Sequence, residues 1–141
     1  MNTIRIPQHI IDAICRQAHD ELPNEACGLL TGRGDTVMRR YALTNVDRSP
    51  EHFSFDPREQ FRVLHSARSD NQRILANYHS HPASPARPSG EDLRLAFDPE
   101  AVYIIVSLMQ PAPDVKAFSV AGGTAQPVAI EIIENPNGDE A

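Results

Sequence analysis

The spacing of apolar positions changes along the chain, and each change marks a predicted element. Between Pro7, which suits a first helical position, and Pro23, which ends the helix, apolar residues recur at the spacing of one buried helix face: Ile11, Ile14, Cys15, Ala18 and Leu22. A second helix is predicted from Asp56 and Pro57, a cap followed by a first-turn proline, to Ser69. A third, short helix is predicted directly after Ser89.

Shorter runs that are continuously apolar or rich in β-branched residues predict strands. They cover residues 26–31, 36–43, 74–81, 102–109, 115–120 and 125–133. Gly32 and Gly34 separate the first two runs, which we therefore expect to form a hairpin. The run 102–109 suits a buried central strand, and Pro127 predicts an edge strand because proline donates no hydrogen bond. This order of elements predicts the α+β (mixed α/β) class, with a single sheet flanked by helices.

The length of 141 residues and the mass of 15.6 kDa fit one domain that can bury a core without disulfide bonds. We expect this domain to span residues 1–134 and the acidic segment 135–141 to be a disordered tail. The first residues lack the apolar run of a signal peptide or membrane span, so we expect a cytoplasmic protein without membrane contact. Cys15 and Cys27 lie among apolar residues and are expected to be free thiols.

The charge balance argues against nucleic-acid binding. The chain has 19 acidic and 13 basic residues and a formal net charge of −6. Binding through phosphate neutralisation needs a clustered positive surface, whereas the adjacent basic pair Arg39 and Arg40 lies in a predicted strand. We therefore expect no nucleic-acid partner.

The stretch that carries candidate chemistry runs from Tyr78 to Asp92. His79 and His81 are two residues apart on a predicted strand, so both imidazoles project from one face and can reach one cation. Asp92 lies at the start of the predicted third helix, and the proline-rich loop before it can bring its carboxylate back to the histidines. Two imidazoles and a carboxylate suit zinc and leave a fourth position for water, as in catalytic sites.

Each of these residues also has an ordinary structural explanation. A single histidine is more often packed or solvated than bound to metal, and Ser89 with Asp92 forms the pattern of a helix capping box. Iron(II) also uses two histidines and a carboxylate. The combination within one short segment favours a metal site, while the residues alone leave both the site and its metal open.

The pattern His-x-His-Pro, six residues, then Ser-x-x-Asp resembles the motif of the JAMM (MPN-plus, JAB-type) zinc metalloproteases. No motif position departs from that pattern. Residues 23–32 resemble the segment that carries the upstream glutamate of short bacterial members, and Asn45 and residues 53–57 are similar as well. The resemblance runs from about residue 7 to residue 120 and implies a JAMM/cytidine-deaminase-like core. The matching motif residues are His79, His81, Pro82, Ser89 and Asp92.

This resemblance implies a role for each site residue. His79, His81 and Asp92 would hold one Zn²⁺ per chain, and Glu25 would act as general base on zinc-bound water and pass the proton to the leaving amine. Ser89 would stabilise the tetrahedral oxyanion. A capping role for Ser89 is compatible with this, because a capping hydroxyl accepts through a lone pair and keeps its own O–H free to donate.

The other candidate side chains receive ordinary assignments. Without the family resemblance, we would expect the Glu25 side chain to be an ordinary solvated carboxylate. Cys27 is expected to be a core residue rather than a nucleophile. The histidines that we do not assign to the metal are His9, His19, His52 and His65.

The resemblance further implies a metallopeptidase. Short members of the family trim small ubiquitin-like sulfur-carrier proteins, so we expect hydrolysis of a peptide or isopeptide bond after the Gly-Gly-like C-terminal tail of such a carrier. One alternative is a DNA-repair-associated JAMM-like protein, which the acidic charge disfavours. Another is a catalytically silent MPN-type interaction module, but such domains typically lose ligands that this chain retains. The oligomeric state is not predicted.

Overall fold

The computed structural model describes residues 1–96 and 98–134, and this part of the chain forms seven strands and three helices. The mixture agrees with the expected α+β class. The boundary expected at residue 134 stays a prediction, and the segment 135–141 lies outside the described residues. In chain order the elements are β1 (Thr3–Pro7), α1 (Gln8–Asp20), β2 (Cys27–Arg33), β3 (Thr36–Leu43), α2 (Pro57–Ser69), β4 (Arg73–His81), α3 (Gly90–Leu95), β5 (Val102–Ser107), β6 (Asp114–Ala121) and β7 (Thr124–Ile133).

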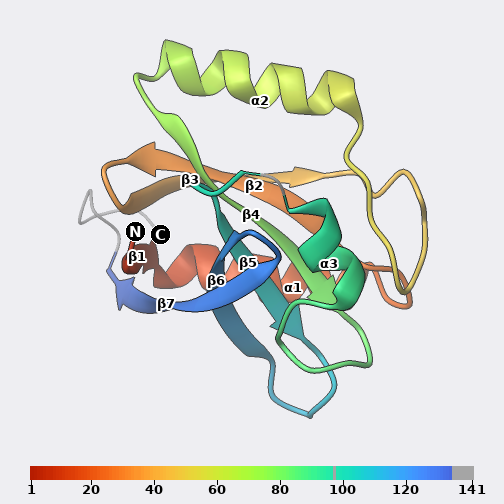
Figure 1. The fold of residues 1–141 in the computed structure, drawn as a ribbon. Coiled ribbons are helices and arrows are strands. Elements are labelled where there is room, and N and C mark those ends of the chain that lie inside the picture. Colours follow the sequence, from red (N-terminus) through yellow and green to blue (C-terminus); the bar gives the residue numbers. More distant parts are fainter. Residues whose placement is uncertain (97, 135–141) are drawn as a thin grey trace.

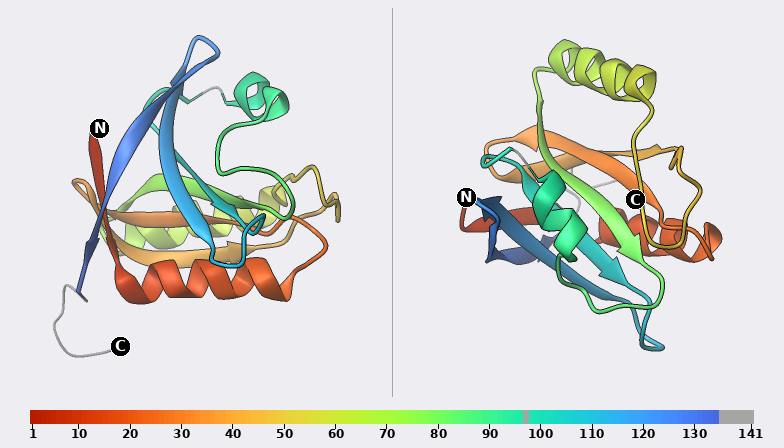
Figure 2. Two further views of the ribbon diagram at one scale, coloured as in Figure 1. Left: turned by 90° about the horizontal axis from the view of Figure 1, so that it is seen from below. Right: turned by 45° about the vertical axis from the view of Figure 1, so that its right-hand side comes forward.

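The strands form one sheet that closes into a barrel in the order β1-β3-β2-β4-β5-β6-β7 (Figures 1 and 2). β2 and β3 form the expected antiparallel hairpin, and Gly34 supplies the positive φ of 59° in its turn. β4 lies between β2, to which it is antiparallel, and β5, to which it is parallel. The closure comes from β1, which pairs with β7 over residues 3–7 but with β3 only through Arg5 and Thr36.

Two expectations about the ends of the chain are wrong. Pro7 is not the first helical residue: its ψ of 142° is extended, it ends β1, and α1 begins at Gln8. β7 is not an edge strand, because β1 covers its second half from Ala129 onward. Pro127 pairs with Phe118 of β6 and lies before that second half, so its missing N–H deprives no neighbour in β1 of a hydrogen bond.

The two long helices cover opposite sides of β2 and β3 (Figure 1). Ile10 and Ile14 of α1 pack in the main core together with Leu30 of β2. On the other side, Val63 of α2 packs with Leu29 of β2 in a second, smaller cluster. Residues 27–32 of β2 are consequently all buried, as expected for a strand covered on both faces.

The start of α2 and the end of α1 can be compared with the helix boundaries predicted from the sequence. The Asp56 side chain accepts a hydrogen bond from the Arg58 amide at 2.9 Å, which confirms the predicted cap of α2. Leu22 departs from the expectation for the first helix. It lies beyond the end of α1 and is 43% exposed rather than on the buried face.

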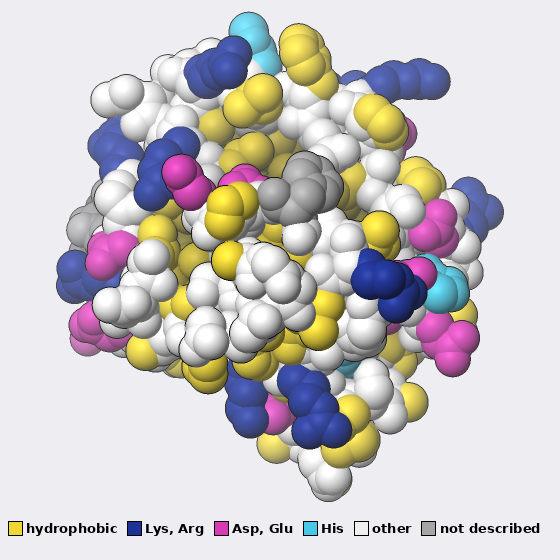
Figure 3. Space-filling model, in the orientation of Figure 1, with side chains coloured by type: hydrophobic (Ala, Val, Ile, Leu, Met, Phe, Trp, Pro, Cys, Tyr) yellow, Lys and Arg dark blue, Asp and Glu magenta, His cyan; other side chains and the backbone are white. Residues whose placement is uncertain are grey.

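The cysteines, the helix lengths and the surface charge bear on the other predictions made from the sequence. Cys15 and Cys27 are free thiols, as predicted, and Cys27 is fully buried. None of the described helices combines the length and apolar character needed to cross a membrane. On the face in Figure 3, arginine and lysine side chains are interspersed with acidic and uncharged ones rather than gathered in one patch.

Candidate metal centre and catalytic residues

The end of β4 places two buried histidines on the same face of the sheet. His79 pairs with Cys27 of β2, and His81 pairs with Ser107 of β5, so the backbone of both is held from neighbouring strands. Side chains two residues apart on a strand share a face. The two Nε2 atoms are 3.1 Å apart, and the residues are only 2% and 4% exposed.

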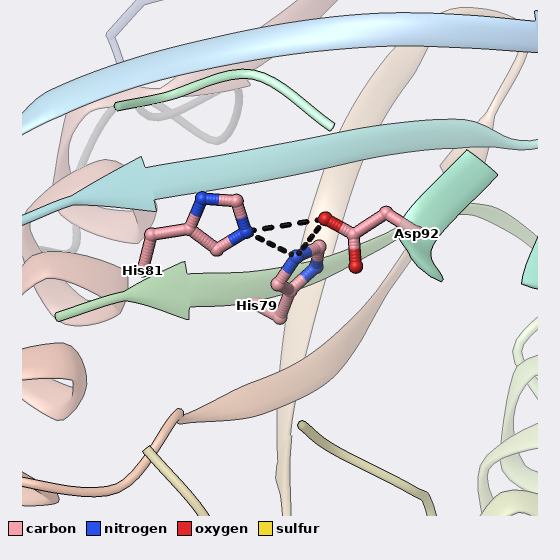
Figure 4. Close-up of side chains that lie close together, drawn as sticks. All are labelled: His79, His81 and Asp92. Atoms are coloured by element: carbon pink, nitrogen blue, oxygen red, sulfur yellow. Dashed lines mark hydrogen bonds and ion pairs between the residues drawn. The ribbon is translucent and has the colours of Figure 1, made fainter. Parts of the chain in front are cut away.

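Asp92 completes the group from the first turn of α3. The Asp92 amide donates to Ser89 Oγ at 3.0 Å, and the Ser89 amide donates back to Asp92 Oδ2 at 2.9 Å. This is a capping box, with aspartate in the place of the usual glutamate or glutamine. Oδ2 also lies 3.2 Å from Nε2 of His79 and 3.1 Å from Nε2 of His81 (Figure 4). The capping box therefore aims the carboxylate at the imidazole pair.

The loop after β4 fixes the tautomer of His81. Its Nδ1 lies 2.8 Å from the carbonyl oxygen of Pro85. A carbonyl only accepts, so Nδ1 carries the proton, and neutral His81 presents the lone pair of Nε2 to Asp92. The hydroxyl of Ser107 donates to the Ser84 carbonyl at 2.6 Å and so secures the same loop. This orientation leaves Nε2 as the atom through which His81 could bind a metal ion.

His79 is held in a drier environment. The ring of Phe53 stacks on its imidazole with centroids 4.5 Å apart. Its Nδ1 atom is buried and has no hydrogen-bond partner among the described residues. Burial lowers the pKa of His79, against the opposing effect of the Asp92 carboxylate, and therefore favours the neutral, ligand-competent ring.

The charges of the three side chains fit a cation. Burial raises the pKa of Asp92, but hydrogen bonds from His79, His81 and the Ser89 amide outweigh it and hold the pKa well below the usual range. For His81, burial lowers the pKa, and the Asp92 carboxylate and Pro85 carbonyl produce a net rise. An ionised carboxylate within 3.2 Å of two imidazole nitrogens requires a proton or a cation between them.

The distances within this group also match a tetrahedral ion. Ligand atoms that bind zinc at 2.0–2.1 Å in a regular tetrahedron lie about 3.3 Å apart. The three atoms here are separated by 3.1 to 3.2 Å, and they form the group of potential ligands found among the described residues. The residues present therefore fit a zinc ion with three protein ligands.

Glu25 lies near enough to this cluster for His81 and Asp92 to influence the pKa of its carboxyl group. It precedes β2 and is 4% exposed. The next residue, Ala26, donates its amide to Ser80 Oγ at 2.8 Å and accepts from the Ser80 amide at 3.0 Å, between the two histidines. Burial raises the pKa of Glu25 to about 8, although the nearby His81 opposes the rise. The solvated carboxylate that sequence alone would indicate is therefore wrong.

The segment 45–55 contributes residues that spacing along the chain does not reveal. Phe53 stacks on His79, and His52 Nδ1 lies 2.5 Å from Glu91 Oε1 on α3. Asn45 donates to the Glu25 carbonyl at 3.0 Å. The family resemblance indicated Asn45 and Phe53, but nothing in the sequence indicated His52, because contacts over such separations leave no local pattern. Cys27 is buried, with its pKa raised by burial to about 12, as befits a core thiol.

Comparisons with known proteins give a family and several named relatives for this chain. A family model described as prokaryotic homologs of the JAB domain matches residues 7–121. A CysO-cysteine peptidase of Mycobacterium tuberculosis is 30% identical over 128 residues, covering 89% of this chain and 88% of that protein. A desampylase of Pyrococcus furiosus is 33% identical over 106 residues, covering 75% of each chain.

Solved structures of other proteins share the fold of this chain. The solution structure of protein DSY2949 from Desulfitobacterium hafniense has a TM-score of 0.85 at 46% identity and covers 93% of both chains. The crystal structure of a JAB1/MPN domain protein from Archaeoglobus fulgidus has a TM-score of 0.65 at 22% identity, covering 94% of this chain and 100% of that one. At that identity, the second likeness concerns the fold alone.

Proposed function

Since the chain belongs to the family of prokaryotic JAB-domain homologs, we propose that it is a zinc-dependent peptidase. Its proposed substrate is a ubiquitin-like carrier protein, cleaved at the peptide or isopeptide bond after a Gly-Gly-like C-terminal tail. The observation that carries the proposal is the convergence of His79 Nε2, His81 Nε2 and Asp92 Oδ2 within 3.2 Å of one another. The names of the relatives, a CysO-cysteine peptidase and a desampylase, support the substrate class.

His79, His81 and Asp92 would hold one zinc ion per chain. The ion would supply a Lewis acid that polarises the scissile carbonyl and lowers the pKa of a coordinated water. The protein contributes two imidazoles and an ionised carboxylate. Strand pairing holds the backbone of His79, the Pro85 carbonyl orients the ring of His81, and the capping box orients Asp92. This preorganisation keeps the three ligand atoms together before any substrate arrives.

Glu25 would transfer the proton. Its carboxyl group is buried near the ligand cluster, and in the metal-free protein burial raises its pKa to about 8, close to neutral pH. A group with a pKa near the working pH can both accept and release a proton. Glu25 would accept the proton of the attacking water and deliver it to the leaving nitrogen. The leaving group would then depart as a neutral amine rather than as an anion.

Ser89 would bind the oxygen that becomes negative. Its Oγ accepts from the Asp92 amide through a lone pair, which leaves the hydroxyl proton available. The capping contact restrains the direction of that proton, and preorganised donors stabilise developing oxyanions most effectively. Ser89 would thus link the geometry of the ligand Asp92 to the geometry of the substrate carbonyl.

A direct test uses a ubiquitin-like carrier extended beyond its Gly-Gly tail by a short peptide. We expect the zinc-loaded protein to release that peptide, as followed by mass spectrometry, and a chelator to stop the release until zinc is restored. Glu25→Gln serves as the matched inactive variant, because it preserves the shape of the side chain but cannot act as the base. Release that persists in the chelated protein or in Glu25→Gln would contradict the mechanism, and a zinc-loaded protein that cleaves no such carrier would contradict the function.

A further inference from the structure

Asn45 occupies the centre of a hydrogen-bonded hub directly after β3. The residue is 5% exposed, and its amide uses all of its usual hydrogen-bonding positions. Nδ2 donates to the carbonyls of Glu25 at 3.0 Å and His52 at 2.9 Å. Oδ1 accepts from the amides of Asp47 at 3.0 Å and Ser54 at 3.3 Å. A buried amide with every partner supplied can adopt one orientation only.

The hub holds the backbone of Glu25 outside any strand ladder. The Glu25 carbonyl accepts from Asn45, and the Glu25 amide donates to the Ser49 carbonyl at 2.8 Å. β2 begins only at Cys27. Both backbone hydrogen bonds of Glu25 therefore go to the segment 45–55, and the position of its carboxyl group depends on that segment.

The same segment is attached to the elements that carry the proposed ligands. His52 contacts Glu91, the neighbour of Asp92 on α3, and Phe53 stacks on His79 of β4. An isolated bridge between Asn45 and Phe55 closes the segment at its base. Asn45 is thus the point at which the backbone of Glu25 joins a segment that also contacts α3 and β4.

We propose that Asn45 is a positioning residue that sets the distance between the Glu25 carboxyl group and the ligand cluster. The inference rests on the proposed function, since it concerns the group that would move the proton. All four hydrogen bonds of the Asn45 amide join backbone groups of residues other than the three proposed ligands, so we expect it to act on proton transfer rather than on metal binding. Misplacement of a reacting group by about 1 Å can cost on the order of 100-fold in rate, and this is the size of effect expected when the hub is broken.

Asn45→Asp tests the proposal with little change in volume. The aspartate retains an oxygen that accepts from the Asp47 and Ser54 amides but loses both Nδ2 donors, so it turns a carboxylate oxygen toward the Glu25 carbonyl. In the zinc-loaded protein we expect kcat to fall about 100-fold, while KM and zinc affinity change by less than about twofold because ground-state binding is untouched. Asn45→Ser, which removes the amide without adding a charge, is measured alongside in case the aspartate variant does not fold.

Ser54→Ala is the matched control within the segment. It removes the hydrogen bond from Ser54 Oγ to Asp47 Oδ2 at 2.8 Å but leaves every contact of Asn45 in place. We expect wild-type kcat for this variant. An equal loss of kcat in Ser54→Ala and in the Asn45 variants would overturn the proposal, because general loosening of the segment would then explain both.

Amide hydrogen exchange gives a readout that does not depend on turnover. In the metal-free protein, the Glu25 amide should exchange at least about tenfold faster in the Asn45 variants than in the wild type and in Ser54→Ala, since local opening governs exchange. The amides of β4 should keep their protection. Unchanged protection of Glu25 would overturn the proposal.

Glu25→Gln, assayed in parallel, separates this inference from the proposed function. Full activity of Glu25→Gln would refute Glu25 as base and, with it, any role for Asn45 in positioning a base. A large loss in Glu25→Gln, combined with wild-type kcat in the Asn45 variants, would refute the positioning role alone.

Discussion

Two substitutions of Ser89 separate its capping role from its proposed catalytic role. Alanine and glycine both remove the hydroxyl, yet they differ as N-caps: Ser→Ala costs about 1 kcal/mol of stability, whereas Ser→Gly costs only a few tenths. The backbone of Ser89, with φ −74° and ψ 169°, accepts either residue without strain. The two variants therefore remove the same hydrogen-bond donor but lower the stability to different degrees.

The structure sets the size of both effects. Ser89 is exposed and caps a helix of six residues, so we expect the low end of the capping range, about 0.5–1 kcal/mol for alanine. In a chain of this length, that loss lowers Tm by about 2–4 °C. Loss of an oxyanion donor costs about 100-fold to 1000-fold in kcat, and this applies equally to both variants. Zinc content should not change, because the Ser89 amide still donates to Asp92 Oδ2.

The assay pairs calorimetry of the zinc-loaded variants with the kinetics of carrier cleavage. We expect equal losses of kcat in Ser89→Ala and Ser89→Gly, although the glycine variant retains nearly the stability of the wild type. If the glycine variant also retained the wild-type kcat, catalysis would follow the stability of α3 rather than the hydroxyl, and the donor role would be refuted. Wild-type kcat in both variants would refute it as well.

Four further outcomes are expected. Glu25→Gln should keep its zinc but lose about 100-fold to 10,000-fold in kcat in the cleavage assay, and full activity would contradict its role. In the metal-stripped protein, burial raises the pKa of Glu25 from 4.5 to about 8, so the folded state holds a proton that the unfolded state releases. Urea unfolding should therefore show stability falling between these pH values, and a curve for Glu25→Gln that falls as steeply would contradict the burial effect. Asp92→Ala should lower the zinc content measured by atomic emission; full stoichiometry would show a misassigned ligand. Burial raises the pKa of Cys27 to about 12, so iodoacetamide at pH 8 should label this thiol only after unfolding, and rapid labelling of the native protein would argue against its burial.

The proximity of His79, His81 and Asp92 could be predicted because much of its geometry is local, whereas their role as ligands was indicated by the family resemblance. His79 and His81 share a face through the two-residue period of a strand, and Asp92 is fixed by a capping box whose pattern is visible in the sequence. Strand spacing and helix capping depend on short-range sterics and hydrogen bonds. Glu25 is different, because its approach to the cluster depends on the pairing of β2 with β4, and only the family resemblance indicated it.

The closure of the sheet could not be predicted from local patterns. β1 pairs in parallel with β7 near the other end of the described chain, and a proline in β7 indicates an edge unless that pairing is known. Pro7 suits both the end of a strand and the start of a helix, and only tertiary pairing decides between them. The hub around Asn45 has the same character, since its partners are brought together by the ending of β3 beside the start of β2.

In the proposed mechanism, hydrolysis depends on one zinc ion held by His79, His81 and Asp92. Stepwise addition of zinc to the metal-stripped protein, with carrier cleavage followed by mass spectrometry at each step, tests it most directly. We expect no cleavage at the start and a linear rise in the cleavage rate that ends at one zinc per chain. Cleavage before any zinc is added, or a protein that binds one zinc per chain without gaining activity, would refute the zinc-dependent mechanism.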